Sequence, residues 1–172
     1  MPKDYRIESC EESPGYRYRL DVSTGIQSQN RLVVVQLNPS TADATKSDPT
    51  IGKVSYWARE HEFGHVTFLN LFAFRTVHPT QLVGQRYAAI VGPRNDAVTR
   101  SALKTADNLI FAWGRIHPSV IAHYQRRMDK LKKILGTRRI QAVGAPVAEL
   151  YPRHGRMWNE NNRTVRDYHW PD

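Results

Sequence analysis

The 172-residue sequence predicts an α/β fold of three layers, α/β/α, with helices on both faces of a central, mainly parallel sheet of four strands. Three observations support this prediction: four apolar runs of strand length, helix-like segments between them, and no repeat or low-complexity tract. Strands that alternate with helices form parallel sheets whose two faces are covered. A chain of this length fits one domain, 1–172, because a single core can hold it.

The strands follow in order along the chain. An alternating segment over 16–20 predicts an exposed strand, and a turn is expected over 25–30. The buried strands of the sheet are predicted at 32–37, 66–70, 108–113 and 140–143. Glycine, proline or asparagine marks the ends of these apolar runs.

Helices are expected in the intervals between the strands. The first begins at a cap and first turn formed by Asp48-Pro49, the second covers about 94–104, and the third begins near His117-Pro118. The segment 71–93 has no clear period, so we expect a loop that carries part of a site. The polar, basic and aromatic segment 145–172 is expected to form a C-terminal tail.

The charge balance predicts a polyanionic partner. The chain has 25 Lys and Arg against 16 Asp and Glu, a formal net charge of +9, and DNA is the expected partner. No apolar stretch approaches the roughly 20 residues of a membrane span, and the first residues lack the apolar core of a secretion signal. A single cysteine, Cys10, excludes an internal disulfide, so we expect a cytoplasmic protein, taken as a monomer.

The positive charge is concentrated in the last third of the chain. From Arg115 onward, twelve Lys or Arg stand against five acidic residues. Guanidinium groups interleaved with aromatic rings suit contacts to the backbone and bases of a nucleic acid. The residues expected to bind nucleic acid are Arg115, Arg153, His154 and Arg156. The alternative is a solvated helix face, followed by a tail that packs its aromatic rings on the body.

Polar side chains follow the carboxyl end of the first buried strand, where α/β proteins bind their ligands. The segment 37–43 contains Asn38, Ser40 and Asp43. Asn38 is expected to hold a water or a substrate heteroatom, and Asp43 and Asp48 to act as general bases or to stabilise a cation. Turns and helix caps use the same residue types, and this is the alternative interpretation.

Later strand ends add groups that would bind a substrate. Asn70 offers a donor and an acceptor that suit a base edge, and Trp113-Gly114 combines a stacking ring with close backbone approach. Further candidates for stacking or phosphate contact are Tyr56, Phe72 and Arg75. Backbone pairing for the asparagine and core packing for the tryptophan are the alternatives.

The sequence predicts neither a metal site nor a cofactor. His61 and His65 are separated by Gly64, which is expected to end the helix between them, and His117 and His123 are not expected to converge. No glycine-rich phosphate loop and no serine elbow of the hydrolase type is present in the sequence.

Four motifs resemble the DUF1643 family, a bacterial and phage family of unknown function. They are Leu37-Asn38-Pro39-Ser40-Thr41-Ala42-Asp43, Asp48-Pro49-Thr50-Ile51, Asn70-Leu71-Phe72-Ala73-Phe74-Arg75 and Ala112-Trp113-Gly114. The resemblance spans about residues 16–150. The family usually ends in Gly-x-Pro-x-His-Pro-Leu-Tyr, whereas this chain reads Gly144-Ala145-Pro146-Val147-Ala148-Glu149-Leu150-Tyr151, without the His-Pro pair.

Shorter segments resemble the uracil-DNA glycosylase superfamily. Asn38-Pro39 after the first buried strand, Asn70 at the end of a later strand and Trp113-Gly114 occur in the order of that superfamily's motifs. The resemblance implies a uracil-DNA glycosylase-like fold, and a base that is flipped out of DNA into a pocket at the strand ends.

Three functions follow as hypotheses. The first is a DNA glycosylase-like enzyme that hydrolyses the N-glycosidic bond of a uracil-like or modified base in DNA. The second is a protein that binds nucleic acid or a modified base without chemistry, and the third is a hydrolase of free nucleosides or nucleotides. Salt-sensitive binding to DNA separates the first two from the third. Release of free base separates the enzyme from the binding protein.

Overall fold

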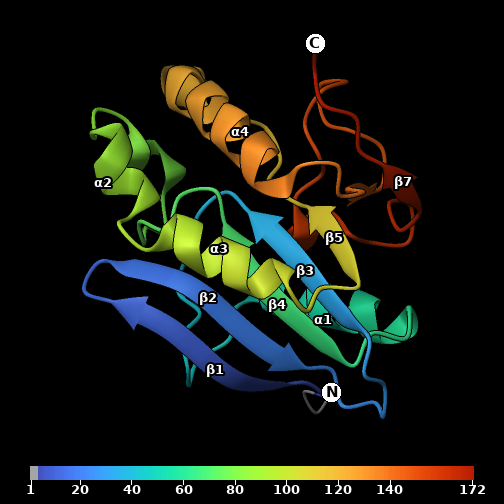
Figure 1. Cartoon of the computed structure of the whole chain (residues 1–172). Coiled ribbons are helices and arrows are strands. Elements are labelled where there is room, and N and C mark those ends of the chain that lie inside the picture. Colours follow the sequence, from blue (N-terminus) through green and yellow to red (C-terminus); the bar gives the residue numbers. More distant parts are fainter. Residues whose placement is uncertain (1–3) are drawn as a thin grey trace.

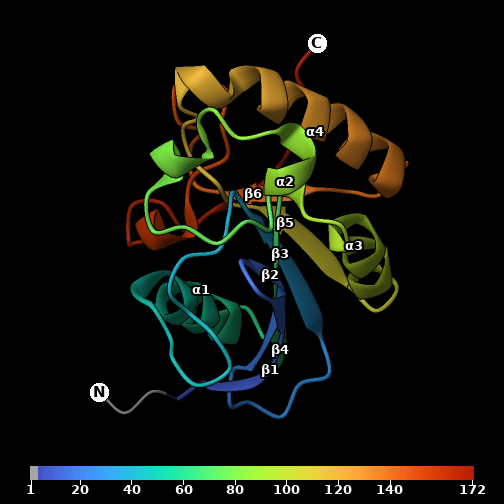
Figure 2. The same ribbon diagram turned by 90° about the vertical axis from the view of Figure 1, so that its left-hand side faces the viewer.

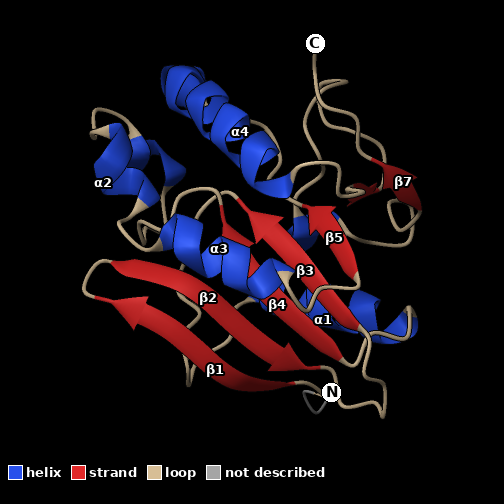
Figure 3. Cartoon of the chain, in the orientation of Figure 1, coloured by secondary structure: helices blue, strands red, loops and turns tan. Residues whose placement is uncertain are grey.

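The computed structural model describes residues 4–172 and places seven strands in one sheet (Figures 1 and 3). The strands are β1 Arg6–Ser13, β2 Tyr16–Ser23, β3 Arg31–Gln36, β4 His65–Asn70, β5 Asn108–Phe111, β6 Gln141–Val143 and β7 Val165–Asp167. Their order across the sheet is β1-β2-β4-β3-β5-β6-β7. β4, β3, β5 and β6 run parallel, whereas β1, β2 and β7 pair antiparallel with their neighbours.

The α/β class is confirmed, but the prediction of a mainly parallel, four-stranded sheet is wrong. The sheet has seven strands, and three of its six pairings are antiparallel. β1 and β7 are edge strands with largely exposed polar side chains, so they contain no continuous apolar run that periodicity could detect. β2, expected at 16–20 as an exposed strand, extends to Ser23 and pairs on both sides.

The α-helices of the described chain are α1 Pro49–Glu60, α2 Tyr87–Val91, α3 Asn95–Leu103 and α4 Ile121–Leu135. In Figure 2, α1 and α3 lie on opposite faces of the sheet. The buried residues of α4 belong to the same core cluster as those of α3. The core divides in the same way, because neighbouring residues of β3 point to opposite faces. Val34 packs in the cluster with α1, whereas Val33 and Val35 pack in the cluster with α3 and α4. No helix within residues 4–172 is both long and apolar enough to cross a membrane.

The predicted start of α1 is confirmed. The Asp48 side chain accepts a hydrogen bond from the backbone N–H of Ile51 at 2.9 Å, and Pro49 occupies the first turn. The segment 71–93, expected as a loop, contains a 3₁₀ turn at Pro79–Leu82 as well as α2. Both elements are too short to show a period in the sequence.

The C-terminal segment 145–172, expected as a tail, contributes to both the sheet and the core. Its strand β7 pairs with β6. The buried ring of Trp158 packs edge-on against Trp57 of α1, with ring centroids 5.1 Å apart. Tyr168 packs edge-on against Phe111 of β5. The aromatic residues of this segment therefore cover the body of the protein, which was the alternative interpretation.

Candidate functional site

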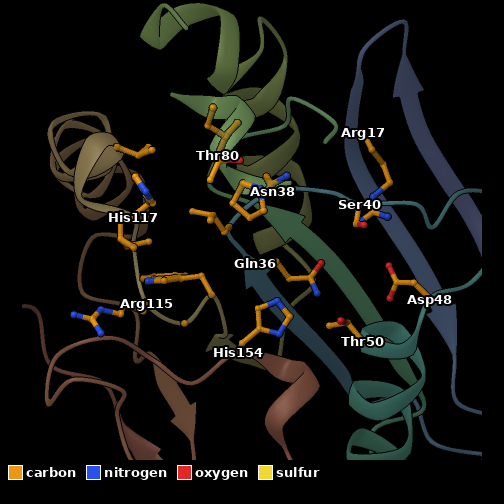
Figure 4. A pocket seen from close by; sticks show the side chains of 17 residues that line it. Arg17, Gln36, Asn38, Ser40, Asp48, Thr50, Thr80, Arg115, His117 and His154 are labelled. Atoms are coloured by element: carbon orange, nitrogen blue, oxygen red, sulfur yellow. The ribbon is translucent and has the colours of Figure 1, made fainter. Parts of the chain in front are cut away.

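A cavity of about 480 Å³ lies at the carboxyl ends of β3 and β5 (Figure 4). The chain leaves β3 toward α1 on one face of the sheet, and it leaves β4 and β5 toward helices on the opposite face. The connections diverge at β3, and such a switch point is the usual ligand site of an open α/β sheet. The polar lining consists of Arg17, Gln36, Asn38, Ser40, Asp48, Thr50, Thr80, Arg115, His117 and His154.

Half of the predicted site residues line this cavity. They are Asn38, Ser40, Asp48, Trp113, Gly114, Arg115 and His154. The residues that lie outside the lining are Asp43, Tyr56, Asn70, Phe72, Arg75, Arg153 and Arg156. The structure thus brings together the ends of β3 and β5, the cap of α1 and one histidine of the C-terminal segment.

Asn38 is held rigidly and keeps one side-chain atom for a ligand. Its Nδ2 donates hydrogen bonds to the backbone carbonyls of Pro39 at 3.1 Å and Thr76 at 3.0 Å. An amide nitrogen carries two hydrogens, so both donors are used. The Oδ1 oxygen is the remaining acceptor, and it can accept a hydrogen bond from a water or a substrate N–H.

Asp48 caps α1 with one carboxylate oxygen, and its side chain also lines the cavity. Oδ1 accepts the hydrogen bond from Ile51, which leaves Oδ2 for a ligand. Burial lowers the pKa of Arg17 to about 10 and also lowers the pKa of His154, and in both cases the Asp48 carboxylate opposes the shift. Asp48 is therefore the carboxylate that acts on both the guanidinium and the imidazole of the cavity.

His154 is held as a neutral hydrogen-bond donor. Burial lowers its pKa below the ordinary value of 6.5, so the imidazole is uncharged near pH 7. Its Nδ1 accepts a hydrogen bond from the backbone N–H of Arg156 at 3.0 Å, so the ring proton is on Nε2. In Figure 4 the ring lies on the same side of the cavity as Gln36 and Thr50, where the Nε2–H group can donate to a ligand.

Gly114 allows this histidine to lie over the end of β5. The φ angle of Gly114 is +77°, and a Cβ atom there would lie 3.3 Å from the Cβ of His154. The backbone N–H of Gly114 donates to the carbonyl of Pro152 at 2.7 Å. On the other side, a Cβ at Gly155 would lie 2.6 Å from Cγ2 of Val54 in α1. Two close backbone approaches therefore position His154 between β5 and α1.

Trp113 and Arg115 lie on either side of Gly114 in the sequence, and the first is buried whereas the second is exposed. The Trp113 ring is 2% exposed and packs against Phe111 and Tyr124, with ring centroids 4.6 and 6.1 Å away. Its indole forms part of the apolar wall of the cavity, and core packing was the alternative interpretation. Arg115 is exposed, and its guanidinium points away from the other labelled side chains in Figure 4.

Sequence analysis missed half of the polar lining. The residues concerned are Arg17, Gln36, Thr50, Thr80 and His117. The Gln36 side chain is buried at the end of β3 and points into the cavity. A glutamine inside an apolar run was the available signal, because a buried amide needs a hydrogen-bond partner. There was no such signal in the sequence for Arg17. Simple alternation along β2 places Arg17 on the same face as Arg19, and therefore does not predict that Arg17 alone faces the cavity.

Asn70, the predicted base-reading residue, is buried and lies outside the lining. Its Nδ2 donates to the backbone carbonyl of Arg17 at 3.1 Å, so the alternative of backbone pairing describes it. Phe72 is fully buried in the core. Arg75 pairs with Glu12 at 2.5 Å. These three side chains hold neighbouring strands and loops together and do not reach the cavity.

The remaining predicted residues are engaged elsewhere on the molecule. Asp43 accepts hydrogen bonds from backbone N–H groups of its own turn, which lowers its pKa. Tyr56 is exposed on α1, with the guanidinium of Arg163 over its ring. Arg153 donates to a backbone carbonyl, and Arg156 is exposed.

The fold and the site together define an α/β protein with a cavity at its topological switch point. Among residues 4–172, no three His, Cys, Asp or Glu side chains converge as metal ligands. The chain belongs to the DUF1643 family, described as a protein of unknown function, whose model matches residues 17–154. This range confirms the family resemblance and contains every lining residue of the cavity. No curated protein and no solved structure matches the chain.

Proposed function

We propose that this protein is a DNA glycosylase-like hydrolase that cleaves the N-glycosidic bond of a uracil-like or modified base in DNA. The observation that carries the proposal is the presence of three groups on one cavity: the Asp48 carboxylate, the Asn38 Oδ1 and the His154 Nε2–H. Cleavage of this bond needs a negative group near the oxocarbenium-like sugar, an oriented water, and stabilisation of the departing base.

The base would be bound by the apolar wall and by Gln36. The cavity volume of about 480 Å³ is within the usual range for small-ligand sites. A base flipped out of DNA would lie against Leu37, Trp113 and Ile116, which supply apolar surface. The Gln36 amide offers a donor and an acceptor to the base edge, and so takes the role that we first assigned to Asn70.

Asp48 and Asn38 act on the sugar and the water. Positive charge develops on the sugar as the glycosidic bond breaks, and the Asp48 carboxylate stabilises that charge. The Asn38 Oδ1 accepts a hydrogen bond from the attacking water. The water oxygen bonds to the anomeric carbon, and the proton that the water loses is balanced by the proton that the departing base takes up.

His154 acts on the departing base. Negative charge accumulates on a carbonyl oxygen of the base as the bond electrons move into the ring. The neutral imidazole donates its Nε2–H to that oxygen, and it does so in a partly buried site where such a hydrogen bond is stronger than in water.

Release of free base from duplexes that carry uracil or modified bases tests the proposal. We expect Asp48→Asn and Asn38→Ala to reduce release at least about a hundredfold. Asparagine caps a helix as well as aspartate does, so Asp48→Asn should keep the stability of α1 while it loses the charge. Asp43→Asn is the matched control, because this carboxylate belongs to the same loop but lies outside the cavity. No release by the wild-type protein across the panel contradicts the enzyme and favours a binding protein.

A hydrolase of free nucleosides or nucleotides is the second candidate, and the engagement of the C-terminal arginines favours it. Arg163 pairs with Glu60, Arg139 pairs with Asp167, and Arg153 donates to a backbone carbonyl. These cations are therefore occupied within the molecule, whereas a DNA-binding groove needs cations that are free to contact phosphates. Base release from free deoxyuridine but not from DNA, with no salt-sensitive affinity for DNA, would select this candidate.

A further inference from the structure

Arg17 is a charged cavity residue that the proposed chemistry does not use. Its side chain is 1% exposed, yet its pKa of about 10 keeps it charged at neutral pH. Buried charges in proteins are ordinarily paired, because an unpaired charge is costly to remove from water. The neighbouring Arg75 forms an ion pair with Glu12. Arg17 donates to a backbone carbonyl, and Asp48 is the carboxylate that acts on it most strongly.

A β-bulge turns Arg17 toward the cavity. In the β1–β2 hairpin, Glu11 lies opposite Arg19 and Glu12 lies opposite Arg17, so Tyr18 is an extra residue in β2. Simple alternation would place Arg17 and Arg19 on the same face, and the extra residue separates them. Bulges of this kind are frequent beside functional sites, where they re-aim a side chain.

The guanidinium of Arg17 has one nitrogen that is hydrogen-bonded and a buried one that is not, among the residues that the structure describes. Nη1 donates to the carbonyl of Ala42 at 2.7 Å. Nε is buried and has no hydrogen-bond partner within residues 4–172. The edge formed by Nε and Nη2 matches two oxygens of a phosphate group. In Figure 4, Arg17 lies beside Ser40, and the Asp48 carboxylate lies between Ser40 and Thr50; the two hydroxyl side chains line the cavity with it.

We propose that Arg17, Ser40 and Thr50 form a phosphate-binding subsite, so that the cavity takes a nucleotide unit in preference to a free nucleoside or base. This inference rests on the proposed function in one respect, since it assigns the phosphate to the substrate whose base enters the same cavity. The phosphate belongs either to the DNA backbone at the flipped nucleotide or to a free nucleotide. Both sources present the same oxygens to the guanidinium.

The Nε–H group of Arg17 reports directly on the subsite in an NMR titration of the full chain. We expect inorganic phosphate and deoxyuridine 5′-monophosphate to shift its resonance, and deoxyuridine to leave it unchanged. Loss of the signal in Arg17→Lys assigns the resonance. An assigned signal that responds to neither phosphate compound overturns the proposal.

Affinities of variants identify the source of the phosphate. We expect Arg17→Lys to weaken binding about tenfold for deoxyuridine 5′-monophosphate, for a short oligonucleotide with one deoxyuridine, or for both. Arg75→Lys is the matched control, because Arg75 donates to the same Ala42 carbonyl from outside the lining. Should Arg17→Lys fail to fold, Ser40→Ala provides the same comparison with a smaller expected loss.

Each outcome separates the two proposals. Weakening confined to the oligonucleotide assigns the phosphate to DNA, weakening confined to the mononucleotide assigns it to a free nucleotide, and weakening of neither overturns the subsite. A phosphate response at Arg17 without base release contradicts the glycosidase activity and supports the subsite. Base release without a phosphate response of the Arg17 resonance supports the glycosidase activity and contradicts the subsite.

Discussion

At the scale of single residues, the chemistry of the cavity is set by the groups that hold each side chain. Asn38 gives both amide hydrogens to backbone carbonyls, and Asp48 gives one oxygen to the start of α1. Each therefore offers one defined acceptor to a ligand. His154 receives a backbone N–H on Nδ1 and keeps its proton on Nε2, so it offers one defined donor. Residue types alone do not specify these roles.

The lowered pKa of His154 predicts a loss of stability in acid. Burial holds this pKa below 6.5, so below pH 6.5 the unfolded chain binds more protons at this residue than the folded protein does. The contribution of His154 is complete above about pH 6.5 and declines as the pH falls toward the folded pKa. In urea unfolding at pH 7 and pH 5, we expect the free energy of unfolding to fall less in His154→Gln than in the wild type. An equal fall in both proteins would contradict this assignment.

Replacing Gly114 with alanine is expected to displace His154. The φ angle of +77° costs alanine about 1–2 kcal/mol of stability, and the added Cβ would lie 3.3 Å from His154. Gly84→Ala is the matched control, since Gly84 has a φ of +78° and no described atom within 4 Å of such a Cβ. Both variants should unfold more easily, but only Gly114→Ala should reduce base release. Equal activity in the two variants would show that His154 does not depend on Gly114.

At the scale of elements, short irregular pieces orient the cavity side chains. The 3₁₀ turns Pro118–Val120 and Gly155–Met157 each follow a histidine whose Nδ1 accepts a backbone N–H. These two histidines, His117 and His154, line the same cavity. The bulge in β2 brings Arg17 to its wall. The regular strands therefore place the cavity, and turns and a bulge supply many of its polar groups.

The attachment of α4 to the sheet depends on a buried, charged side chain. Arg127 of α4 is 1% exposed, and it donates to the carbonyl of Leu71 at 2.7 Å and to Asp96 of α3 at 2.5 Å. Asp96→Ala leaves a buried charge without its partner, so the free energy of unfolding should fall by about 3 kcal/mol. Asp167→Ala breaks an exposed pair with Arg139 and should change little. Chemical denaturation that gives similar values for both variants would contradict the prediction.

At the scale of the whole molecule, the C-terminal segment completes the core on both faces of the sheet. Trp158 packs in the cluster that contains α1, whereas Tyr168 packs against the cluster that contains α4. The segment also adds β7 to the sheet and carries His154 to the cavity. Stability of the body and assembly of the site are therefore coupled through this one segment.

This coupling predicts a severe effect of Trp158→Ala. The side chain is 4% exposed and contacts Trp57 edge-on, so its removal leaves a cavity between the C-terminal segment and α1. We expect a loss of about 3–5 kcal/mol in the free energy of unfolding. The neighbouring Met157 is 46% exposed, and Met157→Ala should change stability by less than about 0.5 kcal/mol. A small effect of Trp158→Ala in thermal unfolding would show that the segment is not part of the cooperative core.

Prediction from the sequence succeeded where the signal was local. The strands β3 and β4 and the cap at Asp48 were recognised from an apolar run or from adjacent cap residues. The edge strands β1 and β7 were missed, because a strand with exposed polar side chains resembles a loop. Asn38 and Gly114 line the cavity because the carboxyl ends of parallel strands, which they follow, meet at one edge of the sheet.

The local order of residues was thus sufficient for the α/β class, the family and the edge of the sheet that holds the cavity. Tertiary structure alone decided that Gln36 and not Asn70 faces the cavity, that Arg17 points inward, and that His154 joins the strand ends. The physical reason is that burial, register and hydrogen-bond partners depend on segments far apart in the chain. One extra residue in β2 reverses the face of Arg17, and one contact between Gly155 and Val54 places His154 beside α1.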